Sequence, residues 1–503
     1  MSTSRKLSFS ANPTLAASGS FCVIFMALGG LFPTHMRNWL ELNTERSLNL
    51  FGHYYLYLGC FIVALLLILA VSKWGGIRLG EGKPEFPLFS WVAMLYSTGM
   101  GAGLLLRAVQ EPVYFFQHPP GTPGYELEVY ALQYTFFHWG LTPWAFYGMF
   151  GLIIAYNLYL KKGTILSSAI LPYSYQKLRW VTPIDTVTVI STLLGVVAAV
   201  GLGSRQLTEG FAYIIGIPSL PAYYTILVVV LVGGIATLSA YLGVSRGIRL
   251  LSNFNISLAL FLLFFSFFQG DMQLILQRFV HSLYYYFRDF IPMSLNVGKS
   301  QVPLPFLTEW TYFYWAFWLA WAPFTGVFIA RISRGRTIRS MILGSLLIPS
   351  IGTFFWFSVF GSEAFLILKG VDHPESLFDS IYTGIFNFFD FLPFSGMSQI
   401  FAFILIGTFL ITSIDSAIYV LGMFTDNGSP QPRKPLRIFW GVVLVLFTSS
   451  LIMVGKEELL SSVSQMLILF ALPFSFLFLG MILYMLYFIW VAPINPFNTK
   501  HPK

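Results

Sequence analysis

Apolar stretches of about 20 residues recur along this chain from one end to the other, and they constrain its fold more than any other feature. A helix of that length matches the roughly 30 Å hydrocarbon core of a bilayer. The pattern predicts an all-α integral membrane protein with twelve transmembrane helices. We place them near 14–33, 51–72, 88–117, 129–160, 184–215, 222–242, 251–269, 309–332, 341–361, 397–424, 436–454 and 463–491.

The positions of the basic residues predict how the chain is oriented. Most of the 29 lysines and arginines lie in segments that are cytoplasmic if both termini are cytoplasmic, as the positive-inside rule requires. The net charge of +8 therefore follows from membrane topology and gives no reason to expect nucleic acid binding. The 2 cysteines indicate neither a disulfide framework nor a cysteine-rich metal site. We expect a multi-pass protein of the cell (plasma or inner) membrane.

Tryptophans recur every three residues in the span near 309–332, at Trp315, Trp318 and Trp321. At 100° per residue they fall within roughly a third of the helix circumference. A second aromatic run at 136–147 contains Trp139, Trp144 and Tyr147. A cage of such rings holds a cation that donates no hydrogen bonds, typically a methylated ammonium, by about 0.5–2 kcal/mol per ring.

Three glycines interrupt the span near 88–117, at Gly99, Gly101 and Gly103. Each costs a helix interior about 1 kcal/mol relative to alanine. Non-helical backbone at membrane depth survives only where it is buried in protein or lines a cavity. The glycines predict a broken helix at a binding site, and close packing of small residues is the alternative.

Five spans separate this break from the tryptophans, an offset that suits two inverted five-helix repeats. We therefore divide the chain into two outer helices (1–87), a first repeat (88–270), an outer amphipathic helix or connection (271–308), a second repeat (309–491) and a short tail (492–503).

The segment WTYFYWAFWLAWAPFTGVFIARISRGRTIR at 310–339 closely resembles the signature of the betaine/choline/carnitine transporter family. Further matches follow in the family's order: IRLG at 77–80, SWVAMLYSTGMGAGL at 90–104, EP at 111–112, HWGLTPWAFY at 138–147, GLG at 201–203, GIRLLSN at 247–253 and TSIDS at 412–416. The resemblance implies twelve helices, a five-plus-five inverted-repeat core and a homotrimer.

The resemblance also assigns residues to the substrate site. Trp139, Trp144, Tyr147 and Trp318 match the box for the quaternary ammonium, and Trp315 and Trp321 match residues of the access path. Phe317 replaces a tryptophan that is common in the family, and it lacks the indole N–H.

Sodium ligands are implied in the same way. Thr412 and Ser413 match hydroxyl ligands, while Ser97, Met100 and Phe409 match residues that lend main-chain oxygens or line the site. A second sodium site matches at Thr192 and Phe324, but Val196 stands where the family has another threonine. Sodium-coupled uptake is the first expectation, with Na⁺ as coupling ion and no other cofactor.

Arg107 departs from the family pattern, in which this position is aromatic or apolar. An arginine inside a membrane is costly and is functional by default. It either holds a substrate carboxylate or sulfonate, or it is neutralised by Glu111 at i+4, as Arg205 would be by Glu209. Because Gly103 supplies no acidic side chain, a zwitterion suits the site better than a bare cation such as choline.

We expect a secondary active transporter for a small zwitterionic or cationic substrate in the lipid bilayer, such as a glycine betaine-like compound. The alternatives are proton symport and sodium-independent exchange of carnitine, choline or sulfonium compounds. An enzyme or a ligand sensor is a weaker alternative. The G-x-S-x-G match around Ser245 lies in a short basic connection, without the strand and helix of a nucleophile elbow.

Overall fold

The computed structural model describes residues 12–99, 101–176, 178, 181–243, 245–372, 374, 376–455 and 458–491. Within these ranges the chain is helical, and the β pairing is an isolated bridge between Arg78 and Thr337. Ten of the described helices are long and apolar enough to cross a membrane. The expected all-α membrane fold is confirmed.

The elements in chain order are α1 (Pro13–Leu31), α2 (Pro33–Val71), η2 (Lys73–Gly76), α3 (Leu88–Gly99), α4 (Gly103–Arg107), α5 (Gln110–Gln117), α6 (Leu127–Trp139), α7 (Leu141–Ala155), η3 (Tyr156–Leu160), η4 (Ser167–Ile170), α8 (Tyr173–Gln176), α9 (Thr182–Ile214), α10 (Ala222–Leu242), α11 (Ser245–Gln269), α12 (Met272–Leu295), η6 (Gly298–Ser300), α13 (Leu304–Phe306), η7 (Leu307–Tyr312), α14 (Phe313–Ile332), α15 (Ile338–Gly370), α16 (Gly384–Asp390), α17 (Ser395–Thr425), α18 (Lys434–Gly455) and α19 (Leu459–Val491).

The third and fourth predicted spans are absent from those ten long helices because both are broken. The break predicted at the glycines is confirmed, since α3 ends at Gly99 and α4 begins at Gly103. The fourth span divides at Gly140, where an added Cβ would lie 2.6 Å from the carbonyl oxygen of Phe136. A residue without a Cβ is therefore needed there. Ten long helices and two broken ones are consistent with twelve spans.

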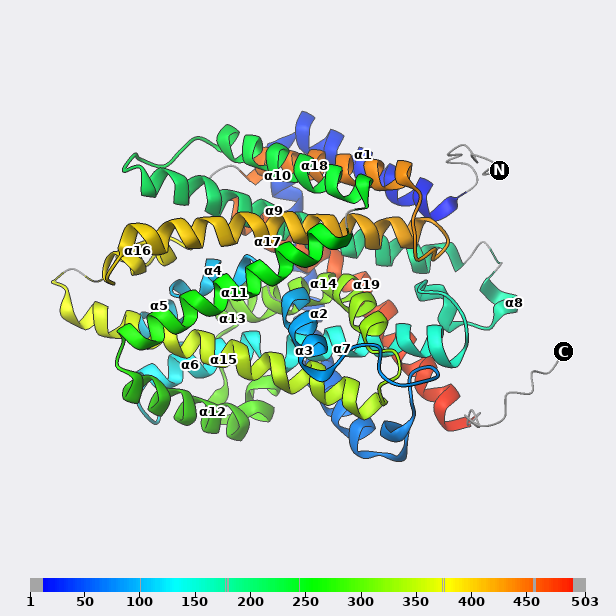
Figure 1. Cartoon of the computed structure of the whole chain (residues 1–503), viewed down its shortest axis with the longest axis horizontal. Coiled ribbons are helices and arrows are strands. Elements are labelled where there is room, and N and C mark those ends of the chain that lie inside the picture. Colours follow the sequence, from blue (N-terminus) through cyan, green and yellow to red (C-terminus); the bar gives the residue numbers. More distant parts are fainter. Residues whose placement is uncertain are drawn as a thin grey trace.

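Helices α9, α10, α17 and α18 run side by side, roughly along the horizontal of Figure 1. The first turn of α1 and the last turn of α19 lie at the same end as α8, on the right, whereas α12 and α16 lie at the opposite end. Helix α14 packs against α7, α9 and α19 near the centre of the bundle. A helix in the middle of the bundle is buried on all sides, which suits the aromatic run it carries.

Helix α12 is the amphipathic helix expected within 271–297, and it is bonded to the bundle through polar side chains. Buried Arg278 pairs with Glu128 at 3.2 Å and donates to the carbonyl of Ser362 at 3.2 Å. The hydroxyl of Tyr286 accepts a hydrogen bond from the backbone N–H of Leu141 at 3.0 Å. Tyr286 thereby satisfies a donor at the start of α7, which the break at Gly140 leaves without a helical partner.

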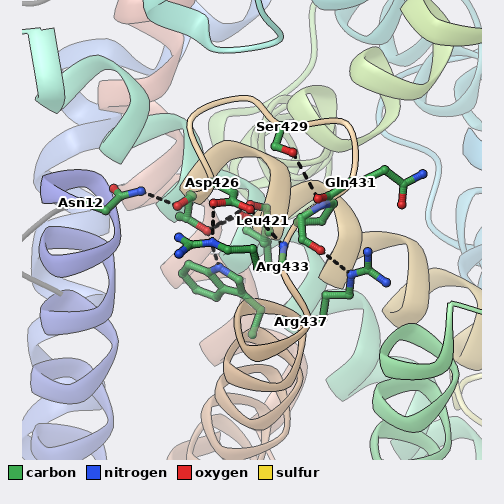
Figure 2. Close-up of polar contacts among 11 residues, drawn as sticks. Asn12, Leu421, Asp426, Ser429, Gln431, Arg433 and Arg437 are labelled. Carbon is green, nitrogen blue, oxygen red and sulfur yellow. Dashed lines mark hydrogen bonds and ion pairs between the residues drawn. The ribbon is translucent and has the colours of Figure 1, made fainter. Parts of the chain in front are cut away.

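The turn between α17 and α18 is tied to the start of α1 (Figure 2). The side chain of Asn12 caps α1 by accepting from the N–H of Leu15 at 3.0 Å, and its amide donates to the carbonyl of Thr425. Within the turn, the Arg433 guanidinium donates to Asp426 at 2.8 Å. The first helix is thus fixed to the end of α17, the helix that carries Thr412 and Ser413.

Candidate substrate-binding cavity

A cavity with about 70 Å³ of internal space lies at the break in the third span, where α4, α6, α9, α14 and α17 meet. Small-molecule sites are often concave and mostly apolar, as this one is. The residues that line it are mostly small or aromatic: Gly101, Ala102, Gly103, Leu106, Arg107, Trp139, Ala199, Val200, Leu202, Gly203, Phe313, Tyr314, Phe317, Trp318, Trp321, Leu410 and Ser413.

Three rings, Trp139, Tyr314 and Trp318, form one side of the cavity and are called the aromatic wall below. The centroids of Trp139 and Trp318 lie 5.1 Å apart with the rings at 68°. Tyr314 stacks on Trp318 at 5.7 Å and meets Trp139 at 5.5 Å. Rings in contact at such angles present both faces and edges to the cavity, and the faces attract cations.

Each ring of the aromatic wall is held by its polar atom. The indole N–H of Trp318 donates to the carbonyl of His138 at 2.9 Å, next to the break at Gly140. The indole N–H of Trp139 donates to Oε2 of Glu111 at 3.0 Å, and the hydroxyl of Tyr314 donates to the same oxygen. Hydrogen bonds to a charged group contribute about 1.5–3 kcal/mol each.

Glu111 and His138 form a fully buried pair behind the wall. Their Oε1 and Nδ1 atoms are 3.4 Å apart, and both side chains are 0% exposed. The other ring nitrogen of His138 lies 3.0 Å from the hydroxyl of Thr311. The sequence predicts Glu111 only as a possible partner of Arg107, and it gives no signal that His138 or Tyr314 belongs to the site.

Phe317 and Trp321 also line the cavity. Their rings stack on each other with centroids 5.8 Å apart. Trp315 does not line it. The ring of Trp315 packs on Phe137 at 5.1 Å, and its Nε1 would lie 2.8 Å from a Cβ added at Gly59 of α2. Trp315 is therefore directed away from the cavity, toward α6 and α2, although its assignment to an access path stays a prediction.

Trp144 and Tyr147 lie behind the wall. Tyr147 meets Trp318 at 6.2 Å and Trp144 meets Tyr147 at 5.5 Å, and neither lines the cavity. Their place in a four-membered box stays a prediction, while the structure brings Trp139 and Trp318 together.

Arg107 lies at the end of α4, lines the cavity and is 5% exposed. It donates to Oε1 of Gln110 at 2.7 Å, and its guanidinium lies 4.8 Å from the ring centroid of Trp310. Among the described residues no ion pair joins Arg107 to Glu111, because the helix is interrupted at Ala108 and Val109; whether Glu111 neutralises Arg107 at a longer distance stays a prediction.

For Arg205 the same expectation is confirmed. Its pair with Glu209 measures 2.8 Å within the continuous helix α9. The contrast shows that the spacing alone does not make a pair; the helix must be continuous between the two residues.

The predicted sodium ligands are only partly brought together. Ser413 lines the cavity, and its hydroxyl would lie 3.6 Å from a Cβ added at Gly101. Thr412 instead donates to the carbonyls of Thr408 and Phe409, at 3.1 and 3.0 Å. The side chain of Ser97 and all of Met100 lie outside the described residues.

The second predicted sodium site is not seen as one group. Thr192 donates to the carbonyl of Thr188 in its own helix at 2.8 Å. Phe324 contacts Trp321 at 5.3 Å, and Val196 is fully buried. Both sodium sites stay predictions.

Broken spans around an aromatic cavity are typical of polytopic membrane transporters, in which discontinuous helices form the substrate site. The model of the BCCT family, the betaine/carnitine/choline family transporters, matches residues 13–490, and the chain belongs to this family. Membership places it among transporters rather than enzymes.

The chain is similar to characterised members over most of its length. It is 38% identical to the glycine betaine transporter OpuD of Bacillus subtilis, covering 90% of each chain. It is 34% identical to the ectoine/hydroxyectoine transporter of Virgibacillus pantothenticus, over 93% of this chain and 95% of the relative. It is also 34% identical to the high-affinity choline transport protein of Escherichia coli K12, over 91% of this chain and 69% of the relative.

Proposed function

We propose that the protein takes up a quaternary-ammonium zwitterion of the glycine betaine type by alternating access. The observation that carries the proposal is the aromatic wall of Trp139, Tyr314 and Trp318 at the cavity beside the broken third span. Aromatic faces attract a methylated ammonium, which water solvates poorly and which donates no hydrogen bonds. Relatives named for glycine betaine, ectoine and choline support this substrate class.

The experiment is uptake of labelled glycine betaine into proteoliposomes, together with equilibrium binding. Trp318→Phe keeps an aromatic ring but loses the indole N–H that donates to the carbonyl of His138. Phenylalanine is also a weaker cation–π partner than tryptophan. We expect the affinity of this variant to fall about tenfold. Trp315→Phe, three residues earlier on α14 but away from the cavity, is the matched control and retains wild-type affinity. Equal effects of the two variants would refute the assignment of the wall.

We also propose that sodium drives uptake. Ser413 on α17 faces Gly101 at the break in the third span, so a hydroxyl lies beside non-helical backbone. Hydroxyl and carbonyl oxygens are the ligands that a hard cation requires. Imposed sodium and proton gradients, and preloading with choline or carnitine, distinguish symport from exchange. Accumulation that is indifferent to sodium would refute this coupling.

We further propose a homotrimer with cytoplasmic termini and a core of two inverted five-helix repeats. Helix α12 supports the assembly, because it exposes a second apolar stripe in addition to its buried face: Leu276, Val280, Tyr284, Phe287 and Ile291. Native mass spectrometry in detergent measures the assembly state. Labelling of single cysteines introduced near each terminus, in intact cells and in permeabilised cells, measures the orientation.

A further inference from the structure

The lining of the cavity carries one formal charge. Arg107 is the only ionisable residue among the described residues that line it, apart from the phenol of Tyr314. Its side chain is almost completely buried, with 5% exposed. A buried charge without a partner is unfavourable, so an arginine kept at this depth requires a reason.

Two of the other buried arginines pair with a carboxylate: Arg205 with Glu209 at 2.8 Å, and Arg278 with Glu128 at 3.2 Å. Arg336 and Arg437, each 7% exposed, instead donate to backbone carbonyls, whereas the hydrogen bond of Arg107 goes to a side chain, that of Gln110. Among the described residues, no carboxylate oxygen lies within the 4.0 Å ion-pair distance of Arg107. The nearest candidate in sequence, Glu111, directs Oε2 to Trp139 and Tyr314.

The other carboxylate oxygen of Glu111, Oε1, lies 3.4 Å from His138 Nδ1 and has no hydrogen-bond partner among the described residues. The recorded contacts of Glu111 are therefore with the rings and with His138, and it makes no direct ion pair with Arg107.

The guanidinium is nevertheless held in place. Gln110 accepts one hydrogen bond at 2.7 Å, and the face of Trp310 lies 4.8 Å away. A guanidinium has five N–H donors in a planar fork, and this fork fits the two oxygens of a carboxylate or sulfonate. One recorded hydrogen bond leaves donors for a ligand in the cavity.

We infer that Arg107 is a specificity-determining residue that binds the anionic end of the substrate, while the aromatic wall binds its methylated cationic end. The substrate class is then a methylated ammonium or sulfonium compound that ends in a carboxylate, sulfonate or sulfate ester. Bare cations such as choline are disfavoured, because they bring a second positive charge into a cavity that already has one. This inference rests on the proposed function and specifies which members of that substrate class bind.

The test measures equilibrium binding of glycine betaine, of its sulfonate analogue and of choline to the purified full chain, wild type and Arg107→Gln. We expect Arg107→Gln to weaken the binding of glycine betaine and of its sulfonate analogue, the two zwitterions, by about 10- to 100-fold. This is the factor typical of a lost charged hydrogen bond. Choline binding is expected to stay constant or to improve. Gln110→Leu removes the hydrogen bond that orients the guanidinium, and it is expected to shift the same preference by a smaller factor.

Arg205→Gln is the matched control, because it removes a buried arginine that does not line the cavity. It is expected to leave the ratio of betaine to choline affinity unchanged. An equal loss for choline and betaine in Arg107→Gln, or no loss for betaine, would overturn the inference while leaving the proposed function in place. Wild-type protein that binds none of the three ligands would overturn the proposed function itself.

Discussion

Replacing Gly103 with aspartate is expected to change the cavity from one that prefers a zwitterion to one that prefers a cation. Gly103 is the first residue of α4 and lies one helical turn before Arg107. A Cβ added there meets Cη2 of Trp139 at 3.4 Å, an ordinary van der Waals contact. An aspartate therefore fits beside the aromatic wall, and an acidic residue is favourable in the first turn of a helix.

The expected magnitude follows from the charges. Side chains one helical turn apart lie about 5 Å from each other. At an effective dielectric constant of about 20, two unit charges at that distance interact by about 3 kcal/mol. The new carboxylate neutralises Arg107 and attracts a cation at the wall, so choline affinity is expected to rise by up to about 100-fold. Betaine affinity is expected to fall, because its carboxylate then meets a negative charge.

Gly103→Asn is the control, since it has nearly the same shape without the charge. The assay is equilibrium binding of labelled choline and glycine betaine, each displaced by the other, at low and high salt concentrations. If the aspartate and asparagine variants change the two affinities equally, the effect is steric and the electrostatic reasoning is refuted.

Three further changes test how the site is built. Glu111→Leu removes the acceptor of Trp139 and Tyr314 and is expected to cost about 3–6 kcal/mol of stability, seen as a lower thermal midpoint in detergent; an unchanged midpoint would contradict the role of these bonds. Ser413→Ala is expected to raise the sodium concentration for half-maximal uptake, whereas Thr408→Val, which changes a hydroxyl bonded within its own helix, is not. Gly140→Ala is expected to lower the yield of folded protein, and Phe354→Ala should not restore it, because the added methyl still meets the backbone oxygen of Phe136 at 2.6 Å.

The tryptophan spacing predicted an aromatic surface on α14, but it did not identify every ring that lines the cavity. Residues three apart differ by about 60° around a helix, whereas residues four apart differ by about 40°. Tyr314, four residues before Trp318, is therefore closer to it in direction than Trp315 is. Tyr314 lines the cavity with Trp318, and Trp315 contacts Phe137 instead.

The pairing of Arg107 could not be predicted from spacing, because the rule assumes an unbroken helix. One signal was present in Pro112, which lies in the first turn of α5. Proline is tolerated in the first turn of a helix and disrupts its interior, so a proline near a polar residue at membrane depth indicates a new helix start. Pro143, in the first turn of α7, gives the same signal for the break at Gly140.

The two breaks contribute different parts of one site. The break at the glycines supplies space and backbone at the cavity, through Gly101 and Gly103. The break at Gly140 lies beside the carbonyl of His138, which holds the indole of Trp318. The side chain of His138 faces Glu111, which holds Trp139 and Tyr314. A movement of α6 relative to α14 would strain the bond from Trp318 to His138, and Glu111 on α5 links a ring of α6 to a ring of α14, so the three rings are expected to move as one unit.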